Sequence, residues 1–184
     1  TVDAYDGSVK LYAFDEQDPV LQTWEKAFPG SVRPKSEISP ALQSHLRYPE
    51  DQFKVQRELL TRYHVDDPGE FFSTVSFWDV PSDPTTESGS AGAPLPPYYL
   101  LADDPQPNAP RTAQFQLTSA LVSLRREFLS AYLSVSSDPQ TYGRITLLQL
   151  PADTQTRGPQ QVQTQFLSSA QVSTELNLLR QQGT

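Results

Sequence analysis

Three consecutive strand-like runs between residues 113 and 151 constrain the fold more than any other part of the chain. In the runs 113–122 and 128–136, apolar and polar side chains alternate with the two-residue period of a strand. The run 144–150 has apolar residues on both faces, so we expect it to be the most buried. Short connections, one of them holding Asp138-Pro139, favour antiparallel neighbours. The sequence predicts an α+β fold: a mainly antiparallel sheet of about five to six strands with helices packed on one face.

Turn and capping residues predict the elements around this sheet. Asp6-Gly7 indicates a hairpin between residues 2–5 and 8–14, which we expect to extend the main sheet. Helices are predicted to begin at Asp18-Pro19 and at Tyr48-Pro49, where proline suits the first helical turn. An aromatic cluster follows the second of these helices. It either forms the base of a groove or packs as core, and we favour core; its members are Phe71, Phe72, Phe77 and Trp78.

Length and composition limit the possible functions. With 184 residues we expect a single soluble domain over 1–184, in which the Pro- and Ser-rich segment 81–97 is a flexible loop. The formal net charge of -8 argues against nucleic acid as a partner. The absence of cysteine excludes disulfides, thiolate metal sites and a cysteine nucleophile. The chain lacks methionine and begins inside a strand-like segment, so we expect it to be excised from a larger protein.

The search for catalytic and metal-binding patterns yields none. His45 and His64 have no partner at the spacing of a metal site, and no nucleophile motif lies between a strand and a helix. Acidic pairs such as Asp66-Asp67 are interpreted as helix caps or turns. We therefore predict no catalytic residue, no metal site and no cofactor, and we lean against an enzyme.

One polar segment, 153–161, is the best candidate for binding. It follows a predicted buried strand and precedes a helix that begins at Pro159, where free backbone N–H groups converge. The simpler interpretation, which we favour, is an ordered polar turn that caps this helix. The candidate ligand-binding residues are Asp153, Thr154, Gln155, Arg157, Gln160 and Gln161.

Several long strings carry a family resemblance. They are 1–7 (TVDAYDG), 18–30 (DPVLQTWEKAFPG), 45–67 (HLRYPEDQFKVQRELLTRYHVDD), 126–151 (REFLSAYLSVSSDPQTYGRITLLQLP) and 153–161 (DTQTRGPQQ). Together they resemble the soluble region of uncharacterised protein family 0182, a family of large actinobacterial integral membrane proteins. The resemblance fails only between residues 82 and 96. It implies a multi-pass parent in the cell membrane, with this domain on the extracytoplasmic side, and it implies no catalytic residue.

Three functional hypotheses follow. The first is a non-enzymatic interaction or assembly module that contacts the membrane domain of its own protein, other envelope proteins or a cell-wall polymer, and it predicts an exposed apolar patch. The second is capture of a small ligand or carbohydrate for envelope transport by 153–161, together with aromatics such as Tyr98, Tyr99 or Trp78. It requires a concave pocket where these residues converge. A cell-envelope hydrolase is the least favoured, since no pair of facing carboxylates is indicated.

Overall fold

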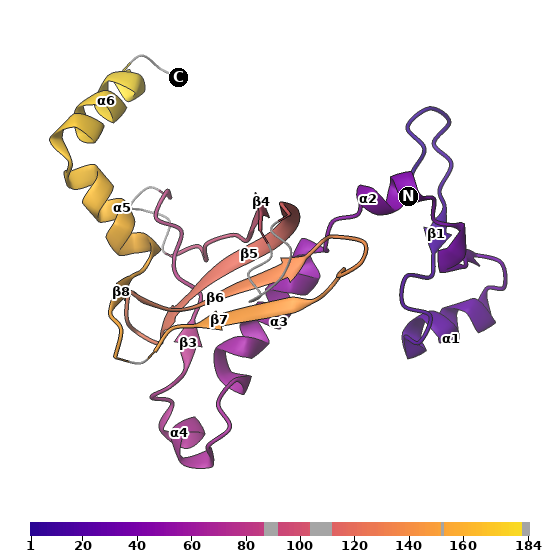
Figure 1. Ribbon diagram of the computed structural model, residues 1–184, viewed down its shortest axis with the longest axis horizontal. Helices are drawn as coiled ribbons and strands as arrows, with labels where there is room; N and C mark the ends of the chain where they lie inside the picture. Colours follow the sequence, from indigo (N-terminus) through magenta and orange to yellow (C-terminus); the bar gives the residue numbers. More distant parts are fainter. Residues whose placement is uncertain (87–91, 104–111, 152, 182–184) are drawn as a thin grey trace. The chain divides into compact units, whose positions relative to one another are not determined.

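The computed structural model describes residues 1–86, 92–103, 112–151 and 153–181 (Figure 1). The chain forms two compact units, unit 1 over residues 1–46 and unit 2 over residues 47–184. The expected single domain over 1–184 stays a prediction, because internal contacts alone do not measure independent folding. No helix within the described residues combines the length and the apolar character needed to cross a membrane.

Unit 1 is built around a small parallel sheet. β1 (Leu11–Tyr12) pairs with β2 (Val32–Arg33), and α1 (Pro19–Ala27) connects them. The 3₁₀-helix η1 (Lys35–Glu37) and α2 (Pro40–Ser44) follow.

The Asp6-Gly7 turn forms as expected, but its second arm pairs elsewhere. Val2 and Val9 make an antiparallel bridge across the turn, and Gly7 has a positive φ of 73°. The expectation that this hairpin extends the main sheet is wrong. Residues 11–12 instead pair with residues 32–33, the next extended segment in the chain. Closing this short loop costs less conformational entropy than pairing with a strand further along the sequence.

Unit 2 contains a six-stranded antiparallel sheet. β5 and β6 form its centre, with β3 and β4 paired to β5, and β7 and β8 paired to β6. This sheet confirms the predicted α+β fold class. The strands are β3 (Trp78–Asp79), β4 (Tyr98–Ala102), β5 (Gln114–Ser123), β6 (Phe128–Ser136), β7 (Ile145–Gln149) and β8 (Thr156–Arg157).

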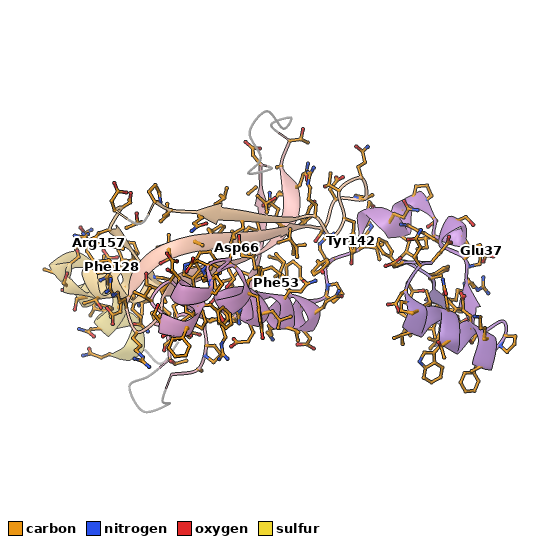
Figure 2. The ribbon with its side chains drawn as sticks, turned by 90° about the horizontal axis from the view of Figure 1, so that it is seen from below. Glu37, Phe53, Asp66, Phe128, Tyr142 and Arg157 are labelled. Carbon is orange, nitrogen blue, oxygen red and sulfur yellow. The ribbon has the colours of Figure 1, made fainter. Side chains whose placement is uncertain are left out.

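The longest helix of unit 2, α3 (Glu50–Tyr63), runs along one face of this sheet (Figure 2). Its Phe53 is fully buried and belongs to one core cluster with Leu117, Leu133 and Val135 of the central strands. Burying one such aromatic side chain contributes about 1.5–3 kcal/mol. The odd-numbered residues of β5 and β6 thus form the face that α3 covers, as their alternation predicts.

The burial of the strands differs from expectation at β7. We expected the third run to be the most buried, yet Ile145 and Leu148 are exposed, whereas β5 and β6 hold most of the buried strand residues. Sequence alternation reports which side chains are apolar, but it does not report which strand lies at a sheet edge. Among the described strands β7 pairs with β6 alone, so its apolar side chains find less cover.

The described part of unit 2 also contains three further helices and a long connection. The helices are α4 (Pro68–Ser73), α5 (Pro159–Ser168) and α6 (Ala170–Gln181), of which α5 contacts both β8 and α6. Within the predicted flexible loop 81–97, residues 87–91 lie outside the described residues. The flanking parts pair with each other: Leu95 N donates to the Pro81 oxygen (2.8 Å) and Asp83 N to the Ala93 oxygen (2.8 Å).

Candidate functional site

A cleft of about 510 Å³ lies beyond the C-terminal end of α3. We call it the α3 cleft. Three walls from separate parts of the sequence line it, formed by residues within 64–78, within 123–130, and by residues 149–151 with 154–155. Asp66 and Phe128, labelled in Figure 2, belong to the first and second walls. Convergence of distant segments on one concave site is typical of ligand-binding pockets.

His64 holds the first wall in place. It is the C-cap residue of α3, and its ring stacks on Trp78 with the ring centroids 3.4 Å apart. Its Nδ1 lies 2.7 Å from the Leu60 carbonyl oxygen and its Nε2 lies 3.0 Å from the Ser76 carbonyl oxygen. Ser76 Oγ in turn donates to Glu70 Oε2 (2.7 Å). The connection between α3 and β3 is therefore tied to the helix end by side-chain contacts.

The second wall is the tight turn between β5 and β6. Arg126 N donates to the Ser123 oxygen (2.9 Å), and the hydroxyl oxygens of Ser123 and Ser130 lie 2.6 Å apart. Among the described residues, the two non-glycine residues with positive φ are Arg125 (60°) and Thr74 (59°), which directly precede lining residues of two different walls. Such conformations cost about 1–3 kcal/mol and often accompany functional sites.

The third wall contains part of the predicted polar segment. Leu150 N donates to the Ser130 oxygen (2.9 Å), which attaches this wall to β6, and Thr154 N donates to the Pro151 oxygen (3.0 Å). Of the six predicted ligand-binding residues, Thr154 and Gln155 line the α3 cleft together with Trp78. These three residues therefore share one pocket, and ligand capture by the polar segment stays a prediction.

The other predicted residues lie outside the α3 cleft. Gln160 lines a separate pocket of about 330 Å³, where its Nε2 donates to the Ser82 oxygen (3.2 Å). Gln161 Oε1 accepts from Gly158 N (3.3 Å) and caps α5, as the simpler interpretation of this segment expects. Arg157 donates to Gln165 on the exposed side of α5, and Asp153 is exposed.

The tyrosines suggested as partners of this segment also lie elsewhere. Tyr98 and Tyr99 belong to β4 and do not line the α3 cleft. The Tyr99 hydroxyl donates to the Tyr48 oxygen (2.5 Å), and partial burial raises the pKa of this phenol. Tyr99 therefore fastens β4 to the residue just before α3.

Sequence reasoning did not find the cleft residues His64, Arg126 and Ser130. His64 has no partner at the spacing of a metal site, and Arg126 stands in a short connection between two predicted strands, with no motif around it. The signals available were the position of His64 directly after a long predicted helix and of Arg126 between two predicted strands. Neither signal shows that the two segments meet, since that depends on the pairing of β3 with β5.

A second candidate surface lies on unit 1. Val20 and Trp24 lie four residues apart on one face of α1, and Phe28, the C-cap residue directly after the helix, stacks on Trp24. Their face borders a groove of about 590 Å³ whose lining is mainly apolar and includes Leu11 and Val32. We call this groove and its lining the α1 surface.

Two aromatic rings dominate the α1 surface. Trp24 and Phe28 stack with centroids 5.1 Å apart, yet they remain 56% and 54% exposed. Every residue of α1 is described, and none is buried. A helix with a well-defined apolar face that packs against so little is typical of an interaction surface.

The described residues contain no group of three or more His, Cys, Asp or Glu side chains able to hold a metal ion. The lining of the α3 cleft combines hydroxyls, amides, two carboxylates and a guanidinium with an apolar part. This chemistry is suited to holding a polar ligand by hydrogen bonds.

Comparison with known proteins gives one consistent result. The family model described as "Uncharacterised protein family (UPF0182)" matches residues 1–179. A UPF0182 protein of Nocardia farcinica is 60% identical over 179 residues, covering 97% of this chain. UPF0182 proteins of Rhodococcus erythropolis and Mycobacterium bovis are 57% and 54% identical, covering 98% and 97% of it.

These relatives are much longer than the chain, which spans 18% of the length of each. None of the solved structures matches it. The match of the family model over nearly the whole chain decides its membership. The chain belongs to the uncharacterised protein family UPF0182.

Proposed function

We propose that this chain is a non-enzymatic docking module, which binds another part of a longer family protein through the α1 surface. The observation that carries this proposal is the exposure of the stacked Trp24 and Phe28, at the apolar face and the C-terminal end of α1. Because each ring is about half exposed, covering its remaining surface by a partner would contribute about 1–1.5 kcal/mol. Together they provide the central aromatic anchors that stable interfaces use.

The proposed occupant of the α1 surface is an apolar segment of the same polypeptide. The relatives extend far beyond the matched residues, so most of the family protein is available to supply such a segment. A segment of the same chain binds at a high effective concentration, so a groove of modest size is sufficient.

The proposal also covers location and partners. The resemblance implies a cell-membrane protein, so we place this module on the extracytoplasmic side, attached through the parts of the longer protein outside these residues. Its partner is then the membrane domain of the same protein, and the alternative partner is another envelope protein.

A photocrosslinking experiment in cells tests this proposal. A photoreactive amino acid replaces Val20 on the apolar face of α1, within the longer family protein in its native membrane. The matched control places it at Lys26, which the helical period puts on the opposite face. We expect Val20 to crosslink to another segment of the same polypeptide, identified by mass spectrometry of the crosslinked peptides, and Lys26 to give much less of this product.

Other crosslinking products would contradict the proposal. A product of twice the mass would identify a second copy as the occupant, and a product with a different protein would identify an envelope partner. Crosslinking to lipid, or equal yields at Val20 and Lys26, would show that the α1 surface does not dock on its own polypeptide.

A further inference from the structure

We propose that the α3 cleft binds a short extended peptide in which an apolar residue stands next to a basic one. This site lies in unit 2 and shares no residue with the α1 surface, so it does not depend on the docking function. The cleft volume of about 510 Å³ lies within the range of about 300–1,000 Å³ that ligand pockets usually have.

The walls of the cleft are fixed without a ligand. His64 connects the end of α3 to Ser76, and the Leu150 N–H connects the third wall to β6. The left-handed Arg125 sets the turn that carries the second wall. A preformed site loses less conformational entropy on binding than a site that must first be ordered.

The charges of the cleft lining select against anionic ligands. Asp66 and Glu70 are exposed on the first wall, and Arg126 is the arginine that accompanies them among the described lining residues. Two carboxylates with one guanidinium repel a phosphate or a polyanion and attract an amine. The net charge of -8 on the whole chain acts in the same direction.

A carbohydrate fits this cleft less well than a peptide does. Sugar rings bind by stacking on exposed aromatic faces, but one face of Trp78 is covered by His64, and both Phe77 and Trp78 are buried. Phe128, the other aromatic residue of the described lining, is only partly exposed. Tyr98 and Tyr99, which could supply such faces, do not line the cleft.

The remaining lining matches a peptide backbone and an apolar side chain. Gln149 and Gln155 are exposed and carry side-chain amides, each with a donor and an acceptor, which is the pair that a peptide group needs. Leu129 and Leu150 are partly buried in the lining and offer apolar contact to one side chain of the ligand.

Titration calorimetry of the chain with the probe peptide acetyl-Ala-Leu-Lys-amide tests the location of the site. We expect saturable binding of one peptide per chain, and loss of measurable binding in Thr154→Trp, where a large side chain at the exposed rim fills the cleft. The control is Thr164→Trp, which places the same side chain on an exposed position of α5. Circular dichroism verifies that both variants fold. If the Thr154→Trp variant binds the peptide as tightly as the unsubstituted chain does, the peptide binds elsewhere and the proposal is overturned.

A second set of titrations tests the class of ligand. The substitution Asp66→Asn should weaken the lysine peptide by about two- to fivefold, as expected for one exposed ion pair. The control Glu58→Gln removes an exposed carboxylate from α3 outside the cleft and should leave binding unchanged. If acetyl-Ala-Leu-Glu-amide binds the unsubstituted chain as tightly as the lysine peptide does, the preference for a basic residue is overturned. Binding of the disaccharide cellobiose without binding of either peptide would replace the peptide by a carbohydrate, and binding of no probe would overturn the site.

Discussion

Arg57 is a charged side chain held almost entirely away from water. It is 4% exposed, and its Nη1 donates to Ser119 Oγ (3.0 Å) and to the Leu95 oxygen (2.8 Å). Its Nε finds no hydrogen-bond partner among the described residues. Desolvation lowers the pKa of this guanidinium, which nevertheless stays charged at neutral pH because arginine starts so high. Arg57 thus joins α3, β5 and the segment before β4 through a single side chain.

Substitution of Arg57 should separate its packing role from its hydrogen bonds. We expect Arg57→Ala to lower the free energy of unfolding by about 2–4 kcal/mol, because it removes buried volume and leaves two acceptors without their donor. Arg57→Met should cost less, because its side chain refills most of the space. Urea denaturation followed by circular dichroism measures both. Arg62→Met, on an exposed position of α3, is the control. Equal losses for the two Arg57 variants would contradict the packing contribution.

Tyr142 gives unit 2 a dependence on alkaline pH. Its hydroxyl donates to the Arg47 oxygen (3.1 Å), and burial, reinforced by Tyr48 and Tyr99, raises the pKa of the phenol. A phenol with a raised pKa in the folded state holds its proton more tightly there than in the unfolded chain. Its contribution is therefore fully present below the unfolded-state pKa of about 10 and is lost as pH rises through the folded-state pKa.

Denaturation at a series of alkaline pH values tests this dependence. We expect the free energy of unfolding to fall more gently above pH of about 10 in Tyr142→Phe than in the unsubstituted chain. The control Tyr5→Phe removes a phenol that is fully exposed. An unchanged slope in Tyr142→Phe would show that other groups cause the alkaline loss.

At the scale of elements, the contact between β8 and β6 depends on one glycine. A Cβ built on Gly158 would lie 2.0 Å from the Glu127 carbonyl oxygen, which is backbone and cannot move aside like a flexible side chain. Gly158 also precedes Pro159 as the N-cap of α5. The close approach of the two backbones therefore sets where α5 begins.

We expect Gly158→Ala to lower the free energy of unfolding by at least about 2 kcal/mol, because the added methyl forces the two backbones apart. Hydrogen exchange of the β8 and β6 amides should increase in the same variant. Gly69→Ala in α4 is the matched control, because its Cβ would meet a side-chain oxygen of Asp67 at 3.1 Å and helix propensity favours alanine there. Similar effects of the two substitutions would contradict the backbone clash.

Local sequence patterns predicted where strands form better than they predicted which strands pair with each other. The two-residue alternation of β5 and β6 gave the sheet and its buried face, since that pattern reflects each strand alone. The second arm of the first hairpin pairs with the nearby residues 32–33, and the exposure of β7 follows from its place in the sheet. Both depend on which segments pair, and here the expectations failed. The same limit applies to the candidate site. Thr154 and Gln155 could be found because they lie in one polar segment, whereas His64 and Arg126 reach the cleft through strand pairing.

At the scale of the whole molecule, the α1 surface determines how the isolated chain behaves in solution. Exposed aromatic side chains bind apolar dyes and promote self-association when their partner is absent. Because Trp24 and Phe28 are more than half exposed, their loss should change the folded state little. We therefore expect loss of the two rings to reduce self-association while leaving the free energy of unfolding nearly unchanged.

The double substitution Trp24→Ser with Phe28→Ser tests this separation. We expect lower binding of an apolar fluorescent dye and weaker self-association in sedimentation, with the free energy of unfolding changed by less than about 1 kcal/mol. Val55→Ser, an exposed apolar position on α3 of unit 2, is the control for a general loss of apolar surface. A large loss of stability would show instead that the two rings belong to the core of unit 1.

Because β5 is long, two short strands pair with it separately, and the stretch of chain that joins them can accept an insertion. Two short strands, β3 and β4, pair with the same strand at different positions, at residues 122–123 and 114–118. Each is held in register by β5 itself, so the stretch of chain that joins them does not set their alignment. Near its two ends this stretch forms an antiparallel bridge between Ser82 and Pro94. An insertion between these two residues therefore starts and ends at one point of the chain and does not pull on the sheet. A reporter peptide or affinity tag inserted there should leave the fold, the α3 cleft and the α1 surface intact.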